Sequence, residues 1–101
     1  MKGKEKKMNT KGSNIKVAIE DLEMIRTLSH PVRMQIAVEL TLHTEYHVAD
    51  LMGILDLPQA DVSTALKYLR GKNIVAFRQE GQRRYYRLNN EKIRKIVEIL
   101  I

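Results

Sequence analysis

Two short apolar stripes separated by a proline constrain the fold of this chain more than any other feature. Apolar residues recur every three or four positions over 48–55 and again over 62–69, which is the spacing of one side of a helix. Between them, Leu57 precedes Pro58. A residue before proline avoids helical backbone angles, whereas the proline itself fits a first helical turn. The sequence therefore predicts two short helices joined by a tight turn, the second beginning near Gln59.

Two more helices are predicted before this pair. An apolar stripe that begins at Ile15 predicts a first helix ending near Leu28. Ser29 is a good N-cap residue and Pro31 suits a first turn, so a second helix is expected to run to about Leu42.

After the pair, the pattern changes to that of a hairpin. Residues 74–78 and 83–88 are β-prone, and Gly81 between them supplies the positive φ that a tight turn needs. Asn89 or Asn90 then caps a last apolar-striped helix. The predicted fold is mainly α with a small β-hairpin: a winged helix-turn-helix of about five helices plus a wing, spanning residues 15–101.

Positive charge is concentrated at the two ends of the chain. Residues 1–14 carry five lysines and one glutamate, residues 15–66 carry three basic and eight acidic side chains, and residues 67–101 carry ten basic and three acidic side chains. The first segment has too few apolar groups to fold alone, so we expect a flexible basic arm that either follows DNA or is inert. The basic C-terminal third fits a polyanionic partner.

Several classes of protein are excluded by composition. With 101 residues there is room for one modest core and one function. No apolar run approaches the length of a membrane span and no signal segment follows the N-terminus, so we expect a cytoplasmic protein without membrane contact. The chain has no cysteine, and the hydroxyls of Ser63 and Thr64 have no paired base. We therefore expect no enzymatic activity.

The solvent-facing side of the helix that starts near Gln59 fits double-stranded DNA. Its residues are mostly small, which allows close approach to base edges, while Gln59 suits adenine and Lys67 suits a phosphate. Asp61 does not fit this pattern, and the sequence leaves its role open. The candidate DNA-binding residues on this helix are Gln59, Ala60, Ser63, Thr64 and Lys67.

The hairpin supplies a second set of candidates. Guanidinium groups bind phosphate in bidentate fashion, and arginines are dense in this segment. An alternative interpretation is that these arginines only discourage edge-to-edge pairing of sheets. The candidate DNA-binding residues of the wing are Arg78, Gln82, Arg83 and Arg84.

Four segments in this order resemble the ArsR/SmtB family of small bacterial winged-helix repressors. They are LSHPVR at 28–33, VADL at 48–51, LPQADVSTALKYL at 57–69 and GQRRYYRLN at 81–89. The resemblance implies a repressor that binds an operator and is released by an inducer. It also implies a homodimer formed by the first and last helices.

The apolar stripes of the two terminal helices independently indicate a dimer, since so small a core cannot cover both. A two-fold dimer predicts a near-palindromic operator. The candidate interface residues are Ile19, Leu22, Ile25, Ile93, Ile96, Val97 and Leu100.

The sequence departs from metal-sensing and redox-sensing relatives. Cysteine ligands and cysteine switches are absent, and only His43 and His47 remain as candidate metal ligands, which is too few for zinc. We therefore expect no metal site and no cofactor, and the inducer stays unknown. Asp56 stands where relatives commonly have glycine, and aspartate tolerates the left-handed backbone that this turn requires.

The main alternative function is a winged helix that binds another protein, as an antirepressor or scaffold, without specific DNA binding. Such a protein is expected to lose the basic wing and to carry bulky or acidic groups on the recognition helix. The wing and helix of this chain show the opposite composition.

Overall fold

The computed structural model describes residues 14–101. The predicted arm, residues 1–14, lies almost wholly outside the described residues. The elements are α1 (Ile19–Leu28), α2 (Pro31–Leu42), β1 (Tyr46–His47), α3 (Val48–Leu55), α4 (Gln59–Gly71), β2 (Val75–Glu80), β3 (Arg83–Leu88) and α5 (Glu91–Leu100). This confirms the predicted five helices and hairpin within the described part of the chain.

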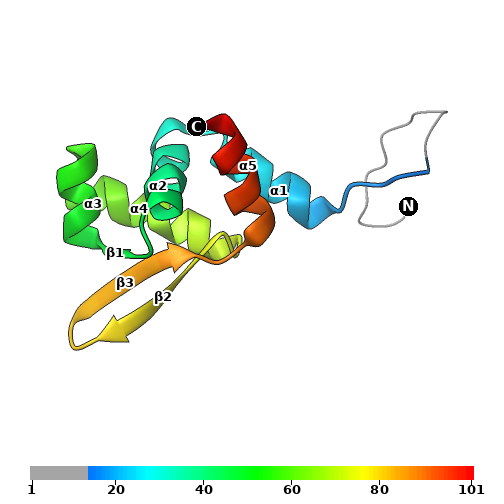
Figure 1. Cartoon of the computed structure of the whole chain (residues 1–101). Coiled ribbons are helices and arrows are strands. Elements are labelled where there is room, and N and C mark those ends of the chain that lie inside the picture. The colour runs from blue at the N-terminus through cyan, green and yellow to red at the C-terminus, as the bar shows by residue number, and fades with distance from the viewer. Residues whose placement is uncertain (1–13) are drawn as a thin grey trace.

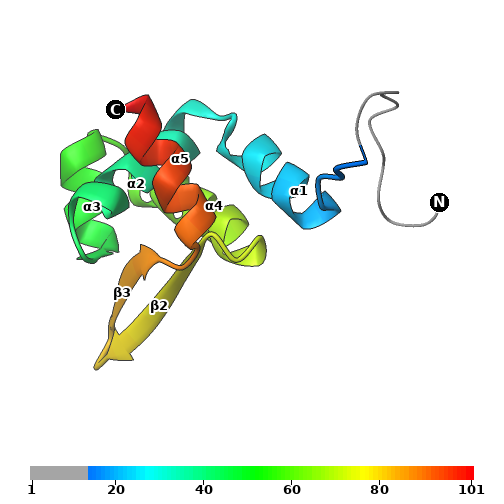
Figure 2. The same cartoon turned by 45° about the vertical axis from the view of Figure 1, so that its right-hand side comes forward.

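The helices pack side by side and the hairpin projects from them (Figure 1). α3 and α4 form the helix-turn-helix, and α1 lies at the end of the molecule away from α3, as the second view also shows (Figure 2). The core is apolar and draws on every helix and on the base of the hairpin. Its most buried residues are Leu28, Ile36, Ala37, Leu40, Leu51, Val62, Ala65, Leu66, Leu69, Ile74, Val75, Tyr86, Leu88, Ile93 and Val97.

The turn between α3 and α4 forms as the sequence indicates. Asp56 caps α3 in the left-handed region, with φ of 56° and ψ of 51°. Pro58 is the N-cap residue of α4, in extended conformation with φ of −68°. Its ψ of 159° places Pro58 outside the helix, so the first helical residue is Gln59.

Several boundaries differ from the prediction. α1 begins at Ile19 rather than Ile15, because Ala18 is extended and the side chains of Ile15 and Val17 are exposed, so burial does not stabilise an earlier turn. Ser29 is the C-cap of α1, and His30 is the N-cap of α2. The predicted cap of α5 is confirmed at Asn90, whose side-chain oxygen accepts from the Ile93 amide at 3.0 Å.

The hairpin belongs to a three-stranded antiparallel sheet of order β1-β3-β2. β2 runs two residues further than predicted, which leaves a two-residue turn in which Gly81 has φ of 62°. β1 was not predicted from the sequence; it pairs Tyr46 with Tyr86 and His47 with Tyr85. A strand of two residues has no alternation of polar and apolar positions that could reveal it.

Candidate DNA-binding surface

One stripe of polar side chains lies along α4. Val62, Leu66 and Leu69 are almost fully buried and fix the opposite side of this helix in the core. The helical spacing then places Gln59, Ser63, Lys67 and Arg70 on one exposed side.

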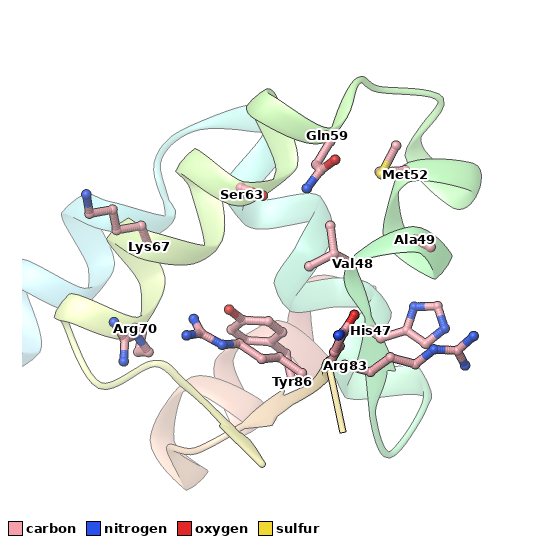
Figure 3. Close-up of a pocket in the computed structure, with 12 residues that line it drawn as sticks. His47, Val48, Ala49, Met52, Gln59, Ser63, Lys67, Arg70, Arg83 and Tyr86 are labelled. Atoms are coloured by element: carbon pink, nitrogen blue, oxygen red, sulfur yellow. The ribbon is translucent and has the colours of Figure 1, made fainter. Parts of the chain in front are cut away.

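The wing faces this stripe. Gln82 lies in the two-residue turn, and Arg83 and Arg84 are the first two residues of β3. Together with the α4 stripe and with the first residues of α3, they line a groove of about 610 Å³ (Figure 3). We call this hollow the α4–wing groove. Its lining residues are His47, Val48, Ala49, Met52, Gln59, Ser63, Lys67, Arg70, Gln82, Arg83, Arg84 and Tyr86.

The α4–wing groove is electropositive. Its lining includes Arg83 and Arg84 of the wing and Lys67 and Arg70 of α4, and no carboxylate belongs to it within the described residues. Low-dielectric walls that carry one sign of charge concentrate the field between them. The groove therefore favours an anionic ligand.

Six of the candidate DNA-binding residues lie in this groove, and three lie elsewhere. Ala60 and Thr64 are exposed on α4 but outside the groove, and Thr64 borders a smaller hollow beside Asp61 and Tyr68. Arg78 points to Glu45 instead: its Nη2 and Nε donate to that carboxylate at 2.7 and 3.1 Å. The hydrogen bonds from Arg78 lower the pKa of Glu45, so this carboxylate stays ionised at neutral pH.

Arg70 and His47 also line the groove, although neither was predicted from the sequence to bind DNA. Arg70 follows Lys67 by three positions, so helical periodicity could have identified it. Its guanidinium carbon lies 5.1 Å from the ring centroid of Phe77, and that of Arg84 lies 4.4 Å from the same centroid. Phe77 thus holds an arginine of α4 and an arginine of the wing close together through cation–π contacts.

The seven candidate dimer residues fall into three groups. Ile93 and Val97 are buried in the core of the protomer itself, and Ile19, Leu22 and Ile96 are half-buried. Ile25 and Leu100 are exposed by 46% and 62%. The last two therefore have the most apolar surface to offer to a partner.

α1 and α5 are joined on the same side of the molecule. Lys92 Nζ lies 2.8 Å from the Asp21 carboxylate, and this hydrogen bond raises the pKa of Lys92. A small apolar hollow between the two helices is lined by Val17, Met24, Ile25 and Ile96, among others.

The two candidate metal ligands do not converge. The ring of His43 packs against Tyr46 at 5.1 Å between centroids, and that of His47 packs against Tyr85 at 5.4 Å. In residues 14–101, no three histidine, aspartate or glutamate side chains come together in an arrangement that could hold a metal ion. None of the helices described has the length and apolar content that crossing a membrane requires.

A helix-turn-helix whose second helix and hairpin wing enclose a basic groove defines the winged helix-turn-helix class of DNA-binding regulators. No family model matches the chain. Individual proteins do: the transcriptional repressor PagR of Bacillus anthracis is 40% identical over 81 residues, which cover 80% of this chain and 81% of PagR. The biofilm growth-associated repressor of Agrobacterium fabrum is 35% identical over 85 residues, covering 84% and 72% of the two chains. The chain belongs to the ArsR/SmtB family of winged helix-turn-helix transcriptional repressors.

Solved structures agree with this assignment. The crystal structure of PagR matches with a TM-score of 0.76 and 36% identity, covering 81% of this chain and 93% of PagR. A homodimeric winged helix-turn-helix DNA-binding domain from Mycobacterium bovis has the same fold, with a TM-score of 0.72 and 23% identity over 80% of this chain and 74% of that one. The relatives are regulators of transcription, and this chain is a regulator and not an enzyme.

Proposed function

We propose that this protein represses transcription in the cytoplasm by binding, as a homodimer, to a near-palindromic operator in duplex DNA. The observation that carries the proposal is the α4–wing groove, whose lining includes four basic side chains from α4 and the wing and no carboxylate among the residues described. Each protomer places α4 in a major groove and the wing along the adjoining backbone.

The side chains of the groove divide by the part of DNA that they suit. Gln59 and Ser63 lie on the exposed stripe of α4. Both carry uncharged polar groups that can form hydrogen bonds with base edges in the major groove. Lys67, Arg70, Arg83 and Arg84 carry the charges that meet phosphates. Phosphate contacts supply most of the affinity and the base contacts supply the specificity.

The proposed dimer interface is the apolar surface of α1 and α5. Ile25, Leu100 and Ile101 expose 46%, 62% and 58% of their surface in the single protomer. Burying them against a second copy removes this area from water, which is the dominant favourable contribution to association. A two-fold axis through this surface presents two α4 helices to half-sites about one helical turn apart, or a multiple of it.

A pair of variants tests the groove. Replacing Arg83 and Arg84 together by alanine removes two phosphate contacts, so the affinity for operator DNA falls and the slope of log K against log salt becomes shallower by about 2. Lys95→Ala is the control, because Lys95 is an exposed cation on α5 outside the groove. Fluorescence anisotropy of labelled duplex measures both quantities. Unchanged affinity and slope in the double variant contradict the proposal and favour a protein partner instead.

A further inference from the structure

A row of three side chains crosses the sheet near the middle of the wing. Tyr85 of β3 is paired with His47 of β1 on one side and with Arg78 of β2 on the other. Side chains of directly paired residues point to the same face of a sheet. The guanidinium carbon of Arg78 lies 4.5 Å from the Tyr85 ring centroid, and the His47 ring makes an edge contact with Tyr85 from the other side of the row.

Arg78 extends this row to the segment that precedes β1. Its Nε and Nη2 donate to the two carboxylate oxygens of Glu45, at distances from 2.7 to 3.2 Å, and its Nη1 donates to Glu80 at 3.2 Å. Glu80 belongs to the same strand as Arg78, whereas Glu45 is 33 residues away in sequence. The contact with Glu45 therefore joins the wing to another part of the fold.

The row also reaches the first helix of the helix-turn-helix. The backbone amide of His47 donates to the Asp50 carboxylate at 3.1 Å, and the His47 Nε2 lies 3.8 Å from the same oxygen. Asp50 is in the first turn of α3. Contacts thus run without a break from β2 of the wing to α3, beside the α4–wing groove.

We propose that Glu45 and Arg78 are positioning residues that hold the wing at the angle at which Arg83 and Arg84 meet DNA, and that Arg78 is not itself a phosphate contact. The inference rests on the proposed function. Two carboxylates offset the charge of Arg78 and engage three of its nitrogens, so contact with a phosphate requires breaking these bonds. Only the two residues of β1 pair with β3, and the outer strand β2 has no such partner on its other side, so the Glu45 contact adds a side-chain link that helps to fix the orientation of the wing.

A positioning role for Glu45 predicts the opposite change in DNA affinity from the one that charge repulsion alone predicts. Removing a negative charge near DNA normally tightens binding, because it reduces repulsion from the phosphates. Glu45→Ala removes such a charge together with the anchor of the wing, so we expect about two- to fivefold weaker binding to the operator, the range that an exposed ion pair supports. Glu80→Ala is the matched control: it also removes a carboxylate that binds Arg78, but one within the wing, and is expected to bind as tightly as the wild type or more tightly.

Arg78→Ala and the double variant complete the experiment. We expect Arg78→Ala to weaken binding as much as Glu45→Ala with an unchanged salt slope, and the double variant to bind no more weakly than either single one, as for two residues that act through one contact. Tighter or unchanged binding by Glu45→Ala, or a salt slope reduced by about 1 in Arg78→Ala, overturns the proposal.

Amide hydrogen exchange of the free protein provides a readout that needs no DNA. Loss of the anchor in Glu45→Ala speeds exchange in β2 and β3 and leaves α4 unchanged. Unchanged exchange in the strands overturns the positioning role even where the wild type binds its operator. If Glu45→Ala speeds exchange in the strands but the wild type does not bind DNA, the role of Glu45 in holding the wing stands and the proposed function is rejected.

Discussion

Asp56 shows how one backbone angle joins the two helices that form the DNA-binding unit. It adopts φ of 56° at the C-terminus of α3, with its side chain exposed. The left-handed region is unfavourable for residues with a Cβ, less so for aspartate and least for glycine. We expect Asp56→Gly to raise the free energy of unfolding by roughly 0.5 kcal/mol and Asp56→Ala to lower it by about 1 kcal/mol. Urea denaturation at fixed protein concentration measures both, and a glycine variant less stable than the alanine variant contradicts this account.

The ion pair of Glu45 has a definite dependence on pH. Its pKa in the folded protein lies below the ordinary value of 4.5, chiefly because of the hydrogen bonds from Arg78. A lowered pKa means that the carboxylate contributes stability above the pKa of the unfolded chain and loses it as pH falls through the folded pKa. The difference in thermal midpoint between wild type and Glu45→Gln is therefore expected to be present at pH 7. It should vanish in acid, once the pH falls below the pKa of Glu45 in the folded protein. A difference that grows as pH falls below 5 contradicts this prediction.

At the scale of the element, the proposed function assigns specificity and affinity to different residues of one stripe on α4. We expect Gln59→Ala to lose discrimination at one operator position, by about 1–3 kcal/mol, because a bidentate base contact disappears. Lys67→Ala is instead expected to weaken all sequences alike and to reduce the salt slope by about 1. A panel of operators with single base-pair changes measures the difference. Equal weakening across the whole panel by Gln59→Ala refutes its role in reading bases.

Local pattern predicted the elements whose signal lies within a few neighbouring residues. The α3–α4 turn followed from Pro58, and the hairpin followed from Gly81 between two β-prone runs. β1 could not be predicted, since its two residues become a strand only by pairing with β3. The partner of Arg78 was equally hidden, because the hydrogen bond to Glu45 depends on how the sheet brings distant segments together.

At the scale of the whole molecule, the proposed dimer interface is the exposed apolar surface of α1 and α5. Ile25→Glu and Leu100→Glu each place a charge on this surface, so we expect either change to convert the dimer to a monomer at micromolar concentration. Ile54→Glu on α3 is the control, because Ile54 is exposed by 43%, close to the 46% of Ile25, but lies on another helix. Sedimentation equilibrium gives the mass directly. Dimers that persist in both interface variants contradict this interface.

The proposed dimer also accounts for how one small domain suffices for a regulator. Two copies of the α4–wing groove on one two-fold axis read a longer site than one copy can, and each adds its own phosphate contacts. Loss of the dimer is therefore expected to reduce operator affinity even though the groove of each protomer stays intact.

The most direct test of the central claim is a titration of the purified protein into labelled duplex DNA from upstream of its own gene. The titration is followed by fluorescence anisotropy at physiological salt with excess nonspecific competitor. We predict saturation at two protomers per site with affinity in the nanomolar range, typical of a specific dimeric regulator. Binding that disappears with competitor contradicts this prediction, because only the general attraction of a basic surface for a polyanion is then present.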